Sequence, residues 1–512
     1  MKTTQRVFLN SATRWFAIAV QGALGLFLVR FLLSELGQDG YGLVSLMGGV
    51  IAFSSIAEFG LSGALSRYLA AQVVSKNNNK FNELASTAML FYIIIGTALA
   101  ISCSLLAEKI AQVLNMPPSL LPQAGFLIRW YAGPAICLSF LSPLYTAVIA
   151  STNRFDILNW ISIGTGLVRA VVLFLLMGLV KMGLYGWVGG MLFSQGLNLA
   201  LAVLAAYRTW PMLRLNPAKA KLDTLHMLFS TGVYLFALQL ANLLGVQADP
   251  LILTAFFGPA AVALYSPATT LVSAIRPLVT TLVDQLHPLA TMYYESGQMK
   301  KLQEVLIRGT KYTLLLGVGA CVVLSVFADT ITQLWLERSL GSQYVVTAQV
   351  LVLWLAIDLL SYAGGTQWPV LLGMNRLRFL TLTQVSFAVL NVAASIVLVR
   401  FTSIGVVGVV IPTLVLALFR RPLIMVYTAH VCGLPFSQYL RGAYLRPAIV
   451  LTLLTGAAVI VRILAKPSAM LALLWGFVLG VLFVALCWWV GFDAADRRFV
   501  LEMLRPKLHM LP

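Results

Sequence analysis

The chain is poor in charged residues, and acidic residues are especially few. Only 10% of its 512 residues are Asp, Glu, Lys or Arg, whereas 60% are hydrophobic. Soluble globular domains average about 25% charged residues. With a mean hydropathy of +0.90, the composition excludes a soluble protein and predicts an all-α polytopic membrane protein, because helices are the simplest way to satisfy the backbone in lipid.

The residue types that build catalytic and metal sites are scarce as well. The chain has four histidines and five cysteines, and no two cysteines have the Cys-x-x-Cys spacing of a redox or zinc motif. We therefore expect no metal and no cofactor. No nucleophile lies beside a base in the sequence, so we expect no catalysis and predict that the protein is not an enzyme.

Long polar stretches are also missing, so no soluble domain is available to hold a large polar partner. The net charge of +18 is that of a nucleic-acid-binding protein, but such a protein needs a basic domain or patch. Here the cations lie in short loops between apolar blocks, where anionic membrane lipids account for them. We expect membrane lipids as partners and no nucleic acid.

Apolar blocks of about 20 residues or more, each long enough to span a bilayer as a helix, follow one another along the chain. About fourteen such spans are predicted, near residues 10–33, 41–65, 86–106, 120–150, 158–180, 184–207, 225–248, 251–286, 312–335, 344–373, 379–399, 404–428, 445–464 and 470–490.

The distribution of Lys and Arg predicts the orientation. One side of the membrane receives 24 of the 35 cations, Arg420 and Arg421 among them, the other side receives six, and five lie inside apolar blocks. Positive residues collect on the cytoplasmic side, so both termini are predicted to be cytoplasmic, and the 287–311 stretch is a cytoplasmic connection. The first block carries arginines and lacks a small-x-small cleavage site, so we expect a retained helix.

A faint internal repeat relates the two halves of the chain. At an offset of 221, Gly37 matches Gly258, and at 222 Asn153 matches Asn375 and Gly183 matches Gly405. Six spans separate the copies, so both copies have the same topology and are related by an axis along the membrane normal. The predicted division is a six-helix lobe at 1–210, a cytoplasmic linker at 211–224, a second six-helix lobe at 225–430, an additional helix pair at 431–492 and a cytoplasmic tail at 493–512.

Two motifs carry a resemblance to a known family. The segment 37–43, Gly-Gln-Asp-Gly-Tyr-Gly-Leu, and the segment 58–68, Glu-Phe-Gly-Leu-Ser-Gly-Ala-Leu-Ser-Arg-Tyr, resemble the opening of the polysaccharide-precursor (Wzx-type, O-antigen and exopolysaccharide) flippases. Their superfamily also holds the multidrug and toxin extrusion (MATE) transporters and the lipid II flippases. The resemblance extends over the whole chain in span number, duplicated lobes and the extra C-terminal pair.

The resemblance implies a function. Members of this family move an undecaprenyl-diphosphate-linked oligosaccharide outward across the bacterial inner membrane by alternating access, with cationic residues in a central cavity. It implies a polyprenyl-diphosphate-linked saccharide as substrate, and polysaccharide polymerase and chain-length machinery as partners. The alternatives are a lipid II flippase, a cation-coupled drug exporter, and a membrane glycosyltransferase or polymerase. The arginine excess counts against the exporter, and the lack of a large extracytoplasmic loop counts against the enzyme.

Five arginines lie inside predicted spans, where each costs at least ~2.5 kcal/mol near the bilayer centre. They predict a cationic cavity for an anionic substrate, and they are Arg14, Arg30, Arg129, Arg169 and Arg276. Arg276 is the foremost candidate, because Pro277 favours a bend beside it and a guanidinium holds a phosphate through two hydrogen bonds. The alternative role is an internal ion pair, for instance with Asp284 or Glu58.

The other arginines have alternatives too. Arg14 can extend to lipid headgroups, Arg30 fits interfacial anchoring, Arg169 fits a structural network, and Arg129 is ambiguous. Polar residues at helical spacing on the first, seventh and eighth spans are predicted to complete the substrate site, and these are Gln21, Asn242, Tyr265, Thr269 and Thr280. The acids at membrane depth either bind a coupling ion or balance the arginines, and these are Glu58, Asp249, Asp284 and Asp358.

Overall fold

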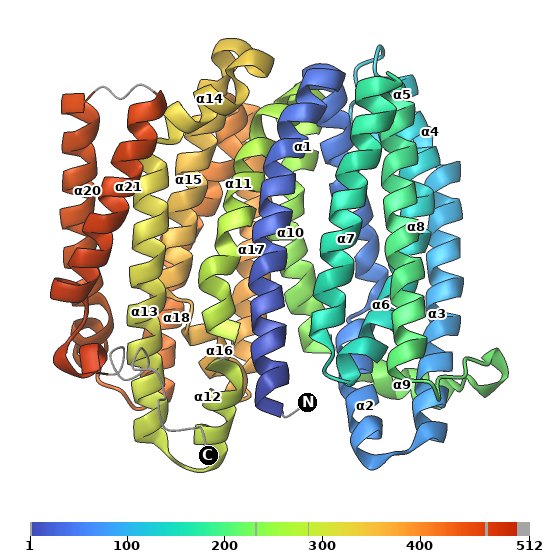
Figure 1. Cartoon of the computed structure of the whole chain (residues 1–512), viewed down its shortest axis with the longest axis horizontal. Helices are drawn as coiled ribbons and strands as arrows, with labels where there is room; N and C mark the ends of the chain where they lie inside the picture. Colours follow the sequence, from blue (N-terminus) through green and yellow to red (C-terminus); the bar gives the residue numbers. More distant parts are fainter. Residues whose placement is uncertain (1–2, 231–232, 285, 466–468, 499–512) are drawn as a thin grey trace. The chain divides into compact units, whose positions relative to one another are not determined.

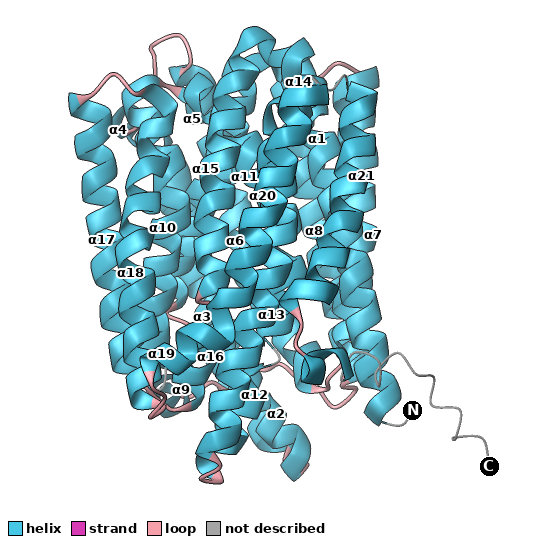
Figure 2. Ribbon diagram, turned by 90° about the vertical axis from the view of Figure 1, so that its left-hand side faces the viewer, coloured by secondary structure: helices cyan, strands magenta, loops and turns pink. Residues whose placement is uncertain are grey.

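A computed structural model describes residues 3–230, 233–284, 286–465 and 469–498 of the chain. These residues form helices joined by short loops, with no strand among them (Figure 2). Within the described part, 13 helical segments are long and apolar enough to cross a membrane. The all-α membrane fold predicted from composition is therefore confirmed.

The chain separates into two compact units. Unit 1 comprises residues 1–274 and 381–412, and unit 2 comprises residues 275–380 and 413–512. The chain crosses from one to the other inside α11, after Ala274, and again at Leu380 and Pro412. The lobe boundaries predicted from the sequence stay a prediction.

Unit 1 is built mainly from the N-terminal helices, which pack as neighbours along their lengths (Figure 1). Its helices are α1 (Thr3–Ser54), α2 (Leu61–Ser75), α3 (Asn78–Leu105), α4 (Ala107–Val113), α5 (Leu121–Leu127), α6 (Gly133–Ser151), α7 (Phe155–Leu173), α8 (Gly183–Thr209), α9 (Leu222–Ser230), α10 (Val233–Phe257), most of α11 (Pro259–Asp284) and most of α17 (Leu377–Phe401).

The two predicted N-terminal spans appear as one element, α1, of 52 residues. At 1.5 Å per residue this is more than twice the length that a 30 Å hydrocarbon core needs. The helix is interrupted at Gly37, whose φ of 69° and ψ of −174° are not helical. Divided there, α1 supplies two spans, and the 13 apolar segments agree with the approximate fourteen predicted.

Glycines on α1 allow α11 to approach closely within unit 1. A Cβ atom on Gly42 would lie 1.9 Å from the Pro259 carbonyl oxygen, and one on Gly22 would lie 3.2 Å from the Ala274 Cβ. Small residues at such contacts let helix backbones meet, which is the common basis of helix association in membranes. The first and eighth predicted spans are therefore neighbours.

Backbone conformation supports the internal repeat. Four pairs of positions separated by 221 or 222 residues both have positive φ: Gly37 and Gly258, Lys76 and Gly297, Asn153 and Asn375, Gly183 and Gly405. Such conformations are rare except for glycine and, less often, asparagine. The repeat thus extends from the sequence to the loops that end its helices.

One predicted boundary is wrong. The apolar pattern predicts that one span ends at Ala248 and that the next begins at Leu251, next to Pro250. Instead α10 continues through Pro250 to Phe257, and the turn lies at Gly258, where φ is 80°. Membrane helices tolerate an internal proline, so Pro250 does not end this helix.

Unit 2 contains the C-terminal part of α11 and the helices that follow. Its remaining helices are α12 (Leu286–Glu295), α13 (Met299–Val326), α14 (Ala328–Leu340), α15 (Tyr344–Ala363), α16 (Gln367–Gly373), α18 (Val410–Val431), α19 (Phe436–Tyr439), α20 (Leu445–Ala465) and α21 (Ala469–Leu486). The last two pack against α13 (Figure 1) through an apolar core that includes Leu315, Val318, Leu454 and Leu479.

A buried ion cluster joins α13 to the segment after α21. Lys311, with a side chain only 3% exposed, pairs with Asp496, whose side chain is fully buried, and with Asp493 over 3.0 Å. The Tyr312 hydroxyl donates to Asp496 over 2.6 Å. Burial favours a higher pKa for Asp493, but the Asp496 backbone N–H and the Lys311 ammonium outweigh burial and hold the pKa at about 2. The predicted placement of Lys311 in a cytoplasmic loop is therefore wrong.

The predicted span at 344–373 is interrupted in the structure. Helix α15 ends at Ala363 and α16 begins at Gln367. Two tyrosines stabilise the break: the Tyr444 hydroxyl donates to the Ala363 carbonyl over 2.7 Å, and the Gln367 side-chain amide donates to the Tyr444 and Tyr439 hydroxyls over 3.1 and 3.2 Å. The apolar sequence hides this break, because Gly364 and Gly365 do not interrupt its hydropathy.

Candidate functional site

A run of polar side chains joins α1 to α7 within unit 1. The Asn159 amide donates to the Thr13 hydroxyl over 3.0 Å, and the Gln21 amide donates to the Ser162 carbonyl over 2.6 Å. Gly166 makes the second contact possible, because a Cβ atom there would lie 2.4 Å from Gln21 Nε2. The predicted polar face of the first span is thus directed, at Gln21, toward α7.

Arg169 lies at the end of this polar run, inside the span Phe155–Leu179. Its Nη2 lies 3.4 Å from Gln21 Oε1, and its Nε is buried without a hydrogen-bond partner. Among the residues that the structure describes, Arg169 makes no ion pair. Its guanidinium is therefore a cation within a membrane helix that no carboxylate in the described part of the chain pairs with.

Arg276 forms an ion pair with Asp358 in unit 2. Its Nη2 lies 2.9 Å from Asp358 Oδ1 and its Nε lies 3.2 Å from Oδ2, so the contact has two hydrogen bonds. The Tyr362 hydroxyl donates to the same carboxylate over 3.2 Å. The Asp358 side chain is 6% exposed, whereas that of Arg276 is 34% exposed. The carboxylate is thus buried, and the arginine side chain is partly exposed.

Arg276 has a partner that its position on α11 does not indicate. The sequence suggests Asp284 or Glu58 as an ion-pair partner, and the structure shows a contact with Asp358, which is distant in sequence and on α15. The side chain of Asp284 lies outside the described residues. Helix α11 continues as a helix across Pro277.

A further arginine of unit 2, Arg421, was not among the candidates. Its Nη2 donates to the Ser361 hydroxyl over 2.7 Å, and a Cβ atom on Gly364 would lie 3.3 Å from its Nη1, so the guanidinium lies at the break between α15 and α16. Its Nε is buried without a hydrogen-bond partner. None of the ion pairs formed by the described residues involves Arg421.

The sequence counts Arg420 and Arg421 with the cytoplasmic cations, outside the group of arginines within apolar blocks. Both lie inside α18, within the span Gly405–Val431. The signal that could have found them is their position, because both precede the end of the predicted 404–428 span by about two helical turns. Arg421 is thus a cation at membrane depth, as Arg169 is in unit 1.

The remaining predicted arginines lie at exposed positions. Arg14 and Arg30 are exposed on α1. Arg129 pairs with Glu108 over 3.2 Å, with side chains 43% and 68% exposed, and such surface pairs contribute about 0–1 kcal/mol. Their roles in substrate binding stay predictions.

The uncharged candidates have ordinary protein partners. The Asn242 side-chain oxygen (Oδ1) accepts from the Gln384 side-chain amide over 3.0 Å. The Thr269 hydroxyl donates to the Ser266 backbone carbonyl of its own helix over 3.0 Å. Tyr265 is 2% exposed, and Thr280 is half-buried in the part of α11 that belongs to unit 2. Their contact with a substrate stays a prediction.

Two of the four acids lie within unit 1. Glu58 is 9% exposed and accepts from the Tyr92 hydroxyl over 2.9 Å and from the Ser62 backbone N–H over 3.1 Å. Asp249 is 1% exposed and accepts from the Tyr265 hydroxyl over 2.9 Å, while its Oδ1 is buried without a partner. Whether they bind a coupling ion stays a prediction.

Comparison with known proteins places this arrangement in a family. The model of the polysaccharide biosynthesis protein family matches residues 27–349, more than half of the chain. The chain belongs to this polysaccharide biosynthesis protein family. The resemblance predicted from the two N-terminal motifs is thereby confirmed, and this family member is a multi-pass membrane protein.

Relatives of this polysaccharide biosynthesis protein are distant in sequence and close in fold. It is 21% identical over 442 residues to the uncharacterized membrane protein EpsK of Bacillus subtilis (strain 168), covering 85% of each chain. The lipid II flippase MurJ in an inward closed conformation is 14% identical with a TM-score of 0.69, covering 97% of this chain and all of that chain.

A second solved structure has the same fold. An inward-facing MATE-family multidrug resistance transporter of the MOP superfamily is 13% identical with a TM-score of 0.68, covering 80% of this chain and 95% of that one. At such identities the likeness shows the fold alone. The MATE-like architecture that the family resemblance implies is therefore confirmed.

Proposed function

We propose that this polysaccharide biosynthesis protein is a flippase that moves an undecaprenyl-diphosphate-linked oligosaccharide from the inner to the outer leaflet of the bacterial inner membrane by alternating access. In this proposal it is a transporter and not an enzyme, and both termini are cytoplasmic. The observation that carries the proposal is the pair of arginines, Arg169 in unit 1 and Arg421 in unit 2, that lie within membrane helices without a carboxylate partner among the described residues.

The physical argument concerns their charge. An uncompensated guanidinium inside a bilayer costs at least ~2.5 kcal/mol, so a water-filled path or a bound anion is needed to stabilise it. A diphosphate supplies two adjacent anionic groups, and guanidinium groups bind phosphate oxygens through paired, charge-assisted hydrogen bonds. Arg276, whose side chain is 34% exposed beside Asp358, is positioned to exchange its carboxylate for a phosphate.

The membrane potential helps movement in the proposed direction. An inside-negative potential favours outward movement of an anion by ~2.3 kcal/mol per charge per 100 mV. A cation-coupled drug exporter has the opposite requirement, because its substrates need acidic partners. Three of the acids at membrane depth are instead engaged by protein groups: Glu58 and Asp249 by tyrosines, and Asp358 by Arg276.

The test is deletion of the gene followed by mass spectrometry of undecaprenyl-linked saccharides in the membrane. We expect accumulation of one complete, unpolymerised repeat unit, restored to the wild-type level by the intact gene and not by an Arg169→Ala variant. Accumulation of the peptidoglycan precursor would instead identify a lipid II flippase. Without any accumulation, in a strain that has no second flippase, the proposal would be wrong.

A further inference from the structure

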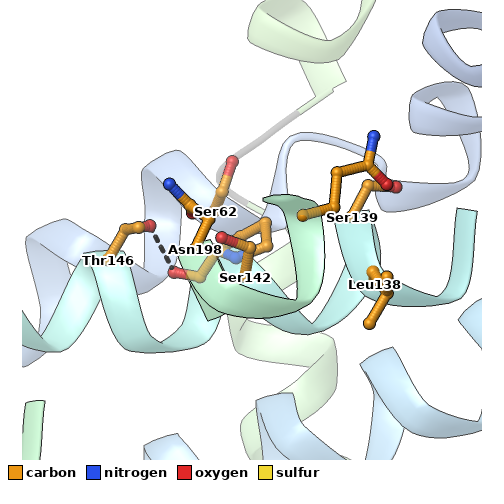
Figure 3. Close-up of a pocket in the computed structure, with 8 residues that line it drawn as sticks. Ser62, Leu138, Ser139, Ser142, Thr146 and Asn198 are labelled. Atoms are coloured by element: carbon orange, nitrogen blue, oxygen red, sulfur yellow. Dashed lines mark hydrogen bonds between the residues drawn. The ribbon is translucent and has the colours of Figure 1, made fainter. Parts of the chain in front are cut away.

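A cavity of about 470 Å³ lies among α2, α6 and α8, wholly within unit 1 (Figure 3). This volume is in the range of small-molecule sites, which is about 300–1,000 Å³. Eight residues line the cavity: Ser62, Leu138, Ser139, Ser142, Pro143, Thr146, Gln195 and Asn198. The predicted site residues do not include any of them.

The lining is polar and uncharged. Six of its eight residues carry a hydroxyl or an amide group, and none carries a charge. A phosphate or a metal ion would have no counter-charge among these residues, and an acyl chain would make no use of their hydrogen-bonding groups. The lining therefore suits a neutral ligand with many hydrogen-bonding groups.

The lining offers more acceptors than donors. The Ser139 hydroxyl donates to the Ile136 carbonyl over 2.8 Å, and the Thr146 hydroxyl donates to the Pro143 carbonyl over 3.1 Å (Figure 3). Both protons are used within α6, so the two oxygens are left as acceptors. Pro143 lies inside α6 and has no N–H, so the Ser139 carbonyl loses its helical donor.

Each of the two amides has one N–H engaged by a protein hydroxyl. The Gln195 amide nitrogen donates to the Tyr131 hydroxyl over 3.3 Å, while Gln195 Oε1 is buried without a hydrogen-bond partner. The Asn198 amide nitrogen donates to the Thr165 hydroxyl over 3.2 Å. A ligand that supplies O–H donors would satisfy the buried acceptor of Gln195, and the side chains of Leu138 and Pro143 would pack against its C–H groups.

We infer that this cavity binds the saccharide portion of the substrate, one or two neutral sugar rings, through their hydroxyl groups. The inference rests on the proposed function and deepens it, because it assigns the sugar to a cavity within unit 1 and the diphosphate to the arginines. Sugar recognition then depends on the uncharged residues of α6 and α8.

The experiment uses the full-length protein in lipid nanodiscs with cellobiose and N,N′-diacetylchitobiose as probes, measured by saturation-transfer NMR. We expect at least one disaccharide to bind the wild type. Ser142→Ala should weaken binding roughly fivefold to tenfold, the effect of one lost hydrogen bond, and Ser142→Phe should abolish binding by filling the cavity. Gln195→Leu should also abolish it, whereas Gln112→Leu, the same change at an exposed position of α4, should not. Size-exclusion profiles verify that each variant is folded.

Flipping assays on the same variants separate this inference from the proposed function. If Ser142→Phe and Gln195→Leu keep wild-type disaccharide binding, or if the folded wild type binds neither probe, the sugar site is refuted even when lipid-linked saccharide is flipped normally. If the disaccharide binds and both variants lose it, the sugar site holds. In that case, failure of the wild type to flip any undecaprenyl-linked saccharide refutes the flippase proposal alone.

Discussion

The ion pair between Arg276 and Asp358 permits a decisive test of what Arg276 does. Arg276→Met removes both hydrogen bonds to a carboxylate that is only 6% exposed and leaves the Tyr362 hydroxyl, at 3.2 Å, as its remaining side-chain donor. Breaking a buried pair costs about 3–5 kcal/mol. Because Arg276 itself is 34% exposed, we expect about 3 kcal/mol, measured by SDS-induced unfolding in mixed micelles.

Transport and stability should then separate in the double variant. Arg276→Met with Asp358→Asn removes the unpaired charge, so its stability should return to within about 1 kcal/mol of the wild type. If Arg276 binds the diphosphate, transport should stay low, because a charge-assisted hydrogen bond contributes about 1.5–3 kcal/mol, or roughly tenfold to a hundredfold in affinity.

The assay for transport is flipping in proteoliposomes, scored by the accessibility of the sugar to membrane-impermeant periodate. Asp358→Asn alone is the matched control, because it keeps the arginine and removes the carboxylate. Recovery of wild-type flipping in the double variant would refute the reasoning, since Arg276 would then serve only to neutralise Asp358.

Four more predictions follow from single contacts. Arg169→Ala should reduce flipping at least tenfold, whereas Arg30→Ala, at an exposed position of α1, should leave it within about twofold, and equal effects would contradict a role for Arg169 in the proposed site. Lys311→Met should lower the unfolding free energy by about 3–5 kcal/mol, because Asp496 would stay buried without its cation. Adding Asp496→Asn should restore part of that stability. Gly42→Ala should destabilise by at least about 1–3 kcal/mol, because its Cβ would lie 1.9 Å from the Pro259 carbonyl oxygen, and Gly48→Ala on the same helix, where nothing lies within 4 Å, should be neutral. Since its pKa is lowered to about 2, Asp493 should contribute stability at all pH values above about 4, so the difference between the wild type and Asp493→Asn should be the same at pH 8 and pH 5.

Much of the fold could be predicted because hydropathy and backbone conformation are local properties. The apolar blocks located the spans, and Gly37, Gly258, Asn153 and Asn375 supported the repeat because the turns they form require positive φ. The boundary at Pro250 was wrong because a proline inside a membrane helix does not have to end it. The break after Ala363 was hidden because the tyrosines that stabilise it come from residues about 80 positions away.

The site was harder to predict, because its partners are set by packing between distant segments. Spacing along α11 suggests Asp284 as a partner of Arg276, but it gives no sign of the contact with Asp358, which is 82 residues away on α15. Arg421 was missed because a count of loop cations does not register an arginine two turns inside a span. The cavity lined by Ser142 and Gln195 had no sequence signal, since serine and glutamine in apolar helices are also common in plain helix packing.

The cluster of Lys311 with Asp493 and Asp496 bears on how this architecture can be shortened. A MATE-like core of twelve spans would end before α20, so α20 and α21 are the helices that a truncated variant would leave out. A chain cut there would keep a lysine that is 3% exposed and lose both of its carboxylates. A minimal twelve-span version of this protein therefore needs an apolar residue at position 311 as well as a new stop codon.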